Sequence, residues 1–254
     1  MGRAKEIEVK VIPSNIANPF IKKHHYSGKV VQNSNLHFGS FLDNQLHGAM
    51  SFGSSMDKSK IQQLVSGTGW NEFIELNRMA FDDYLPRNAE SYCISRAIKL
   101  IKKNAPQIKW IISFADGCQC GDGTIYRASN FVLTGIKPNK TILEFPTGDR
   151  IAAMTLESHF TLDIVKKQCE YFGIEHKYRT RSEWIKIGNG KVKYIEGYML
   201  RYIYFIDKSY RNRLTVPEIP FSKIDELGAG MYKGKKITQA ERHSILSESQ
   251  KEGD

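Results

Sequence analysis

One amphipathic helix between two strand-like segments constrains this fold more than any other feature of the sequence. Residues 72–81 (EFIELNRMAF) alternate between apolar and polar side chains as a strand does, and residues 109–115 (KWIISFA) form an apolar run typical of a buried strand. Between them, residues 89–104 carry apolar side chains at helical spacing, and Pro106 prevents the helix from continuing. A strand, a helix and a strand in this order predict a βαβ crossover in an α/β protein.

Other patterns extend this prediction to a mixed α/β sheet. Two turn signals, Asp43-Asn44 and Asn189-Gly190, predict tight hairpins, the second one within residues 184–194. An antiparallel hairpin ahead of the crossover, with a loop before a helix N-terminus that can bind phosphate, favours an acyltransferase of the GNAT type. Further strands are predicted at 7–12, 37–42, 46–52, 131–136 and 197–206, and further helices near 14–25, 124–129 and 163–172.

The length of 254 residues suits one large domain or two small ones. We expect a GNAT-like core at 1–150, a basic, aromatic-rich and strand-rich C-terminal extension at 151–232, and a polar, disordered tail at 233–254. The sequence shows neither an apolar run of membrane-span length nor a signal peptide, and its four cysteines are too few for a disulfide framework. We therefore expect a protein of the reducing cytoplasm that does not enter a membrane.

The charge is strongly basic, with 37 Lys and Arg against 27 Asp and Glu, a formal net charge of +10. Residues 166–213 hold 12 basic side chains, 5 acidic ones and seven of the twelve tyrosines, a mixture that suits phosphate contact and base stacking. The alternatives are a basic protein without a polyanionic partner and a strand-rich subdomain with half-buried tyrosines. The candidate DNA-binding residues are Lys177, Arg179, Arg181, Lys186, Lys191, Lys193, Arg201, Arg211 and Arg213.

Three long stretches resemble the Mom family of phage and prophage DNA-modification proteins. They are FIELNRMAFDDYLPRNAES at 73–91, KWIISFADGCQCGDGTIYRASNFVLTG at 109–135, and MLRYIYFIDKSYRNRLTVPEIPFSK at 199–223, followed by MYKG. The resemblance covers most of 20–234. It implies a GNAT-like fold and a transferase that places a carbamoylmethyl (acetamido) group on N6 of adenine in double-stranded DNA, which protects phage DNA from restriction enzymes of the bacterial host.

The resemblance implies a donor site at the start of the long helix, in the segment LPRNAES (85–91). GNAT enzymes cradle coenzyme A here with a Gly-rich loop, and this chain has none. Arg87 instead offers a two-pronged phosphate contact, and Asn88 and Ser91 offer short polar groups for acetyl-CoA or a related acyl donor. Arg78, on the strand before the loop, is a further candidate for the donor. The structural alternative is that Asn88 caps the helix while Arg87 is solvated.

The candidate catalytic residues lie at the end of the buried strand and on the next helix. Ser113 and Asp116 come at the carboxyl end of the strand, where side chains face the cleft of open α/β sheets. In the GNAT fold a tyrosine of the following helix protonates the departing thiolate, and Tyr126 matches it by position. Asp116 is expected to accept a proton or to orient the attacking amine. Alternatively, Tyr126 packs in the core and Asp116 caps the next turn.

His25 and Tyr26 follow the first helix, where GNAT enzymes shape the acceptor site. His25 suits a base near neutral pH, and Tyr26 suits stacking on a flipped adenine. The alternative is that the His24-His25 pair only ends a helix. Cys118 and Cys120 are a weak metal signal, because structural zinc sites usually show two spaced pairs. The family resemblance implies iron as one option, without a recognisable ligand set.

Two rival functions remain open at this point. One is an acetyltransferase of the same fold acting on a protein lysine or a small amine. The other is a DNA-binding protein without catalysis, which the intact LPRNAES and SFAD segments disfavour.

Overall fold

The computed structural model describes residues 3–118, 120–232 and 234–244 and forms two compact units. Unit 1 comprises residues 1–136 and 200–254, and unit 2 comprises residues 137–199. Compositional shifts had placed the boundaries at 150 and 232 instead. The difference arises because the chain after unit 2 returns to unit 1, where Tyr198–Phe205 form an inner strand of its sheet. None of the described helices is long and apolar enough to cross a membrane.

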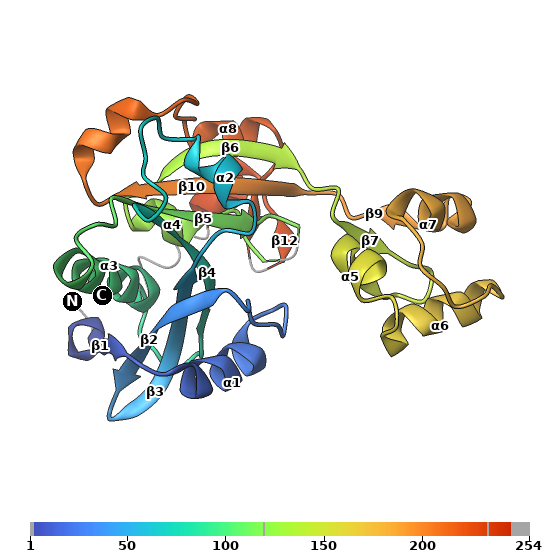
Figure 1. Ribbon diagram of the computed structural model, residues 1–254, viewed down its shortest axis with the longest axis horizontal. Coiled ribbons are helices and arrows are strands. Elements are labelled where there is room, and N and C mark those ends of the chain that lie inside the picture. The colour runs from blue at the N-terminus through green and yellow to red at the C-terminus, as the bar shows by residue number, and fades with distance from the viewer. Residues whose placement is uncertain (1–2, 119, 233, 245–254) are drawn as a thin grey trace. The chain divides into compact units, whose positions relative to one another are not determined.

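Unit 1 is built on a seven-stranded sheet in the order β1-β2-β3-β4-β5-β10-β6 (Figure 1). Pairs β1-β2, β2-β3 and β3-β4 are antiparallel, and β4-β5 is parallel. The predicted mixed central sheet is therefore confirmed. Its strands are β1 (Glu8–Val11), β2 (Ser34–Leu42), β3 (Gln45–Gly53), β4 (Phe73–Phe81), β5 (Trp110–Asp116), β6 (Val132–Pro138) and β10 (Tyr198–Phe205).

The predicted crossover between β4 and β5 is also confirmed. Helix α3 (Ala89–Asn104) connects the two strands and buries the apolar stripe that its sequence predicts. The predicted hairpin between β2 and β3 turns at Asp43 and Asn44, both at positive φ. The other helices of unit 1 are η1 (Arg3–Glu6), α1 (Ser14–His24), α2 (Lys58–Gln62), α4 (Thr124–Ala128), η2 (Lys208–Arg213) and α8 (Ser222–Glu226).

Unit 2 packs three helices on a small sheet around the fully buried Trp184. The sheet has the order β8-β7-β9, and its neighbouring strands are antiparallel. The strands are β7 (Ile142–Glu144), β8 (Arg150–Ala152) and β9 (Lys193–Tyr194), and the helices are α5 (Ala153–Ser158), α6 (Asp163–Phe172) and α7 (Arg181–Gly188).

The hairpin predicted at Asn189-Gly190 is wrong. Residues 181–188 form helix α7, whose start is fixed by a capping box between Thr180 and Glu183. Asn189 (φ 42°) ends this helix in the left-handed conformation, and Gly190 (φ 83°) follows. A helix C-terminus requires the same left-handed residues as a tight hairpin turn, so the dipeptide did not distinguish the two.

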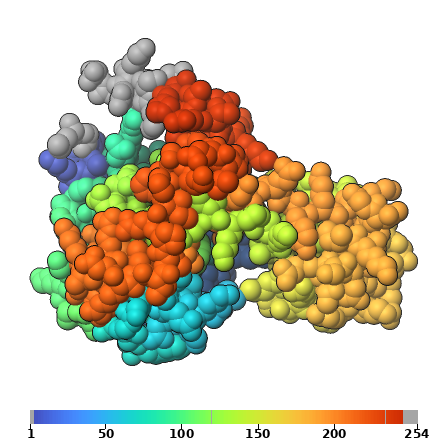
Figure 2. Space-filling view, turned by 90° about the horizontal axis from the view of Figure 1, so that it is seen from above, coloured from blue at the N-terminus to red at the C-terminus, as the bar shows by residue number. Residues whose placement is uncertain are grey.

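The tail predicted to be disordered from residue 233 is ordered over its described part. Residues 235–236 form strand β12 (Lys235–Lys236) against β11 (Met231–Tyr232), and residues 239–244 are helical. Arg242 is buried there, so the segment packs on unit 1, on whose outer surface the red part of the chain lies in Figure 2. Residues 245–254 of the predicted tail lie outside the described residues.

Candidate active site

The turn after α1 meets the carboxyl end of β5. The Tyr26 hydroxyl donates to Asp116 Oδ2 at 3.4 Å, and the other Asp116 oxygen accepts the backbone N–H of Cys118 at 3.0 Å. The His25 ring lies against the Tyr26 ring, with centroids 4.4 Å apart. The adjacent residues His25 and Tyr26 therefore lie together with Asp116, a third predicted catalytic residue that is distant in sequence. The bond from the Cys118 N–H means that Asp116 also caps the turn after β5, which was the alternative to a catalytic role. Its second oxygen still accepts from Tyr26.

Tyr126 of helix α4 lies beside strand β5. Its hydroxyl is 2.8 Å from Ser113 Oγ, which is itself 3.0 Å from the carbonyl oxygen of Leu76. A carbonyl can only accept, so the single Ser113 proton goes to Leu76 when both bonds are made, and the Tyr126 hydroxyl donates to Ser113. The Tyr126 side chain is 9% exposed and packs against Phe131 and Tyr202. Tyr126 is thus a core residue whose hydroxyl proton has a defined position.

The protonation states of His25, Tyr26 and Tyr126, which with Asp116 and Arg78 form the candidate catalytic cluster, follow mainly from burial. Burial, and then the Arg78 charge, lowers the pKa of His25 to about 4. Burial raises the pKa of Tyr126 to about 12 and also raises the pKa of Tyr26, with the Asp116 charge as a second cause for Tyr26. At neutral pH the cluster therefore presents two protonated phenols and a neutral imidazole.

Arg78 supplies a cation to this cluster. Its Nε donates to the Lys29 carbonyl at 3.2 Å and its Nη1 to the Asn77 carbonyl at 2.7 Å. Its charge acts on His25, Tyr26 and Tyr126. The structure thus places Arg78 with the candidate catalytic residues, whereas the sequence had grouped it with the donor site.

Two further residues of this cluster were not predicted as catalytic. Burial raises the pKa of the Glu75 carboxyl, and the Glu75 charge acts on Tyr126. The Cys120 side chain is exposed, but desolvation of its thiol, and then the Asp116 charge, raise the pKa of that thiol. Glu75 is paired in register with Ile112 of β5, one residue from Ser113. Glu75 could have been predicted from the alignment of β4 with β5. That alignment depends on both strands together and cannot be read from the sequence of either one.

The start of helix α3 carries the predicted donor-site residues. Asn88 adopts the left-handed conformation (φ 64°), and its side chain makes no capping bond, so the expected capping by Asn88 is wrong. Ser91 Oγ donates to the Asn88 carbonyl at 3.1 Å. Arg87 is exposed and has no ion-pair partner among the described residues. The N–H of Ala89 donates to the Pro86 carbonyl at 3.1 Å and that of Tyr92 to the Asn88 carbonyl at 3.2 Å. With no side-chain cap, the N–H groups of Glu90 and Ser91 remain to face an anion.

The candidate DNA-binding residues of unit 2 differ in how accessible they are. Arg179 is 7% exposed, donates to the Lys177 carbonyl and lies over the Trp184 ring. Lys186 and Lys191 are exposed, without an ion-pair partner among the described residues. The other three are paired with acidic side chains, Lys177 with Glu175, Arg181 with Glu157 and Lys193 with Glu144.

The three candidate DNA-binding residues of unit 1 all contact other side chains of the protein. Arg201 is half-buried and bonds Thr134 through its Nε and Nη2. Arg211 makes a two-pronged pair with Glu218 at 2.5 and 2.6 Å, and Arg213 lies 4.1 Å from the Tyr210 ring centroid. The basic excess is also not concentrated in unit 2, whose 63 residues hold 11 basic and 8 acidic side chains.

The described residues contain no group of three or more His, Cys, Asp and Glu side chains arranged to hold a metal ion. Cys118 is buried and Cys120 is exposed. The residues present therefore do not fit the metal site, iron included, that the sequence left open, and no step is derived through a metal.

Comparison with known proteins identifies one family. Residues 6–223 match the model of the Mom protein family. The methylcarbamoylase Mom of Escherichia phage Mu is 39% identical over 133 residues, which cover 52% of this chain and 55% of that protein. The chain thus spans about half the length of this curated relative.

Solved acetyltransferases show a remote likeness. An IAA acetyltransferase from Bacillus cereus is 11% identical with a TM-score of 0.41, over 79% of this chain and 99% of that one. A GNAT family acetyltransferase from Elizabethkingia anophelis with acetyl-CoA bound is 11% identical with a TM-score of 0.39, over 79% and 98%. Both TM-scores are below 0.5.

Proposed function

The chain belongs to the Mom protein family, and on that premise we propose that it is a GNAT-like transferase that modifies adenine in double-stranded DNA. The group placed is carbamoylmethyl (acetamido), on the exocyclic N6, and it shields phage DNA from restriction in the bacterial cytoplasm. The observation that carries the proposal is the hydrogen bond between Tyr26 and Asp116 at the carboxyl end of β5, the strand that Tyr126 contacts through Ser113. The 39% identity to a protein named methylcarbamoylase supports it.

Adenine N6 is a poor nucleophile because its lone pair is delocalised into the ring. The amine loses a proton when it forms its new bond to carbon, and we assign Asp116 Oδ2, which accepts from Tyr26, to take that proton. Tyr126 is protonated at neutral pH and is assigned to return a proton to the leaving group. Tyr26 is 49% exposed and offers a ring on which a flipped base stacks.

We assign the donor to the start of α3. To deliver a carbamoylmethyl group, a coenzyme A-type donor must carry that group on its sulfur, so that N6 bonds to the methylene carbon while the carbon–sulfur bond breaks and the thiolate leaves. An acetyl thioester would give an N6-acetyl adduct instead. Arg87, exposed and unpaired among the described residues, and the uncapped N–H groups of α3 suit the phosphates of such a donor. Ser91, whose hydroxyl donates to the Asn88 carbonyl, keeps two acceptor lone pairs, which suit an N–H or O–H group of the donor and not its phosphates.

DNA binding is assigned first to the exposed and unpaired Lys186 and Lys191. Lys177, Arg181, Lys193, Arg211 and Arg213 contribute where phosphate replaces their carboxylate or aromatic partners. Arg179 and Arg201 are held by the fold, and we assign them structural support of the neighbouring surface.

The test is expression of the full chain in bacteria, digestion of their DNA to nucleosides and measurement of the mass of every adenine species. A new adenine species heavier by an acetamido group supports the proposal. A different adduct on adenine retains the site and replaces the donor. Unmodified DNA from folded protein, together with acetylation of an amine substrate, overturns the proposal in favour of an amine acetyltransferase.

A further inference from the structure

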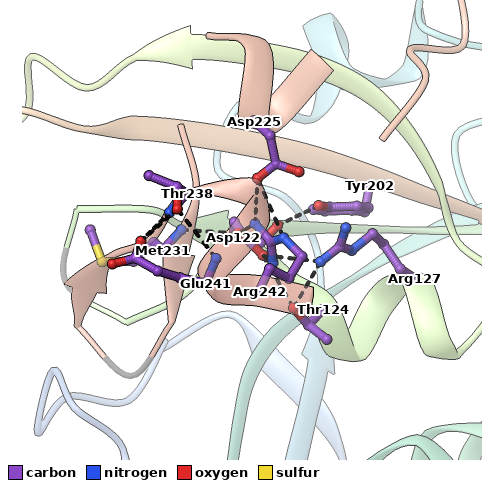
Figure 3. A network of polar contacts seen from close by, with 9 residues as sticks. All are labelled: Asp122, Thr124, Arg127, Tyr202, Asp225, Met231, Thr238, Glu241 and Arg242. Carbon is purple, nitrogen blue, oxygen red and sulfur yellow. Dashed lines mark hydrogen bonds and ion pairs between the residues drawn. The ribbon is translucent and has the colours of Figure 1, made fainter. Parts of the chain in front are cut away.

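Asp122 is a fully buried carboxylate that the proposed chemistry does not use (Figure 3). It follows the loop that starts at Asp116 and directly precedes Gly123, the N-cap of α4. Its oxygens accept from Thr124 at 3.2 Å and from the backbone N–H of Met231 at 2.9 Å. A buried charge requires a charged partner, and the main one is Arg242, whose Nη2 lies 2.5 Å from Asp122 Oδ2.

Arg242 joins two acidic residues from different parts of unit 1. Its Nη2 also lies 3.0 Å from Asp225 of α8, and Arg127 of α4 approaches Asp122 at 3.5 Å. The Arg242 side chain is only 10% exposed. The pair therefore lies where Coulomb attraction is weakly screened and where a lost partner leaves a charge uncompensated.

The same C-terminal segment also binds the backbone of the loop. The N–H of Gly234 donates to the Cys120 carbonyl at 2.7 Å, and the N–H of Asp122 donates to the Met231 carbonyl at 3.1 Å. Within the C-terminal segment itself, Gly230 permits the close approach of Ile237, because a Cβ at Gly230 would lie 2.3 Å from the Ile237 carbonyl oxygen. The loop between Asp116 and α4 is thus held by the C-terminal segment at Cys120 and Asp122.

The helical turn that carries Arg242 has its own N-terminal cap. The Glu241 carboxylate accepts both the backbone N–H of Thr238, at 2.6 Å, and its hydroxyl, at 2.8 Å. The N–H of Glu241 in turn donates to Thr238 Oγ1 at 3.3 Å. This exposed cap fixes the direction in which Arg242 enters the protein. The whole segment lies beyond residue 223, where the family match ends.

We propose that Arg242 is a positioning residue for the transfer reaction, acting through Asp122 on the loop that carries Asp116 and on helix α4 that carries Tyr126. This inference rests on the proposed function. Asp116 and Tyr126 come from the two ends of one short connection, and the C-terminal segment holds that connection at Cys120 and Asp122. Loss of Arg242 frees both ends, while the sheet, the DNA-binding lysines and the start of α3 remain as they are.

The test compares Arg242→Ala, Arg242→Lys and Glu241→Ala with the full-length wild type, using adenine modification of duplex DNA. Arg242→Ala is expected to lower kcat about 10- to 100-fold, the size of effect that a small misplacement of reacting groups produces. KM for DNA stays within about twofold of wild type, since no phosphate contact is removed. Arg242→Lys keeps the charge but loses the two-pronged contact, and it restores part of kcat. Arg3→Ala is the control. It also removes an arginine that pairs with an aspartate, Asp43, but that pair is exposed, so kcat is expected to stay unchanged.

A second readout does not depend on activity. Cys120 is the exposed cysteine, whereas Cys93, Cys118 and Cys169 are buried. Alkylation of Cys120, followed by mass spectrometry, is expected to be several-fold faster in Arg242→Ala and Glu241→Ala than in wild type and in Arg3→Ala. Glu241 is exposed, so Glu241→Ala tests the proposal even where Arg242→Ala does not fold.

The outcomes are distinct. Wild-type kcat per folded molecule together with wild-type Cys120 reactivity, in Glu241→Ala and in folded Arg242→Ala, overturns the positioning role. A drop in folded protein with unchanged kcat per folded molecule also overturns it, because it shows a structural role only. Wild-type protein that modifies no DNA overturns the proposed function instead, and the Cys120 rates still report on the loop.

Discussion

The hydroxyl of Tyr126 lies 2.8 Å from Ser113 Oγ, and this contact ties helix α4 to the central strand β5. The Ser113 hydroxyl donates a hydrogen bond to the Leu76 carbonyl of the neighbouring strand, so Ser113 is left to accept the hydrogen bond from Tyr126. A buried phenol held in this way, with its pKa raised to about 12, remains protonated throughout the physiological range.

Tyr126→Phe removes this proton and little else. We expect adenine modification to fall about 10²-fold or more, the usual contribution of a positioned acid, and the free energy of unfolding to fall by about 1 kcal/mol. The measurement is the initial rate of adduct formation, with thermal unfolding alongside. Tyr210→Phe is the matched control, because the Tyr210 side chain is also buried and its hydroxyl donates to Glu72. A wild-type rate in Tyr126→Phe would remove the general-acid role.

His25 should be a neutral imidazole, not an imidazolium, over most of the working pH range. Its pKa is about 4 in the folded protein against an ordinary value of 6.5. The folded state thus binds fewer protons than the unfolded state between these values, and the free energy of unfolding falls as the pH drops from about 6.5 to about 4.

The check is the pH dependence of unfolding of wild type against His25→Gln. The Gln variant lacks this titration, so its disadvantage relative to wild type should shrink as the pH is lowered through that window. An NMR titration that places the His25 pKa near 6.5 would contradict the burial described for this side chain.

Gly123 should tolerate no side chain. Its φ is +88°, and an added Cβ would lie 2.4 Å from the Tyr202 ring. We expect Gly123→Ala to cost about 3 kcal/mol from the left-handed backbone and the clash together, and to lower activity because Gly123 begins the helix of Tyr126. Gly190→Ala is the control. Its φ is similar, +83°, but no atom lies within 4 Å, so its cost should be about 1 kcal/mol. Equal losses in denaturant unfolding would show that the Tyr202 contact does not matter.

The DNA-binding assignment predicts a strong dependence on salt. Binding of duplex DNA should weaken steeply between low and moderate salt, and Lys186→Ala and Lys191→Ala should each reduce the slope of log K against log salt by about 1. Both lysines are exposed, so folding is retained. Fluorescence anisotropy at several salt concentrations measures the slope. An affinity that changes little with salt would contradict the assignment of these lysines to phosphate contacts.

Much of unit 1 was predictable because its signals are local. The apolar stripe of residues 89–104 identifies α3, and Asp43-Asn44 identifies the hairpin of β2 and β3. Strand β10 follows β9 in the sequence and yet lies between β5 and β6 in the sheet. Pairing between such distant segments leaves no local pattern, which is why the domain boundary at 150 did not match the structure.

The candidate site was predictable in its residues but not in its geometry. Tyr26, Asp116 and Tyr126 were predicted through the family resemblance, and they lie in one cluster. Whether a charged side chain is exposed, buried or paired was not predictable, because this depends on residues that are distant in sequence. The sequence suggests Arg179 as a phosphate contact, for example. In the structure this side chain is buried and lies over the Trp184 ring. Arg242, within an expected disordered tail, proved to be paired with a buried aspartate.

The central claim is that the cluster around Asp116 modifies adenine, and one measurement tests it most directly. Wild type, Asp116→Asn and the surface control Arg3→Ala are expressed at equal folded levels in bacteria, and the adenine nucleosides of the DNA are measured by accurate mass. The account predicts an acetamido-modified adenine with wild type and Arg3→Ala and its loss, by about 10²-fold or more, with Asp116→Asn. The same adduct at wild-type level in Asp116→Asn would contradict the account.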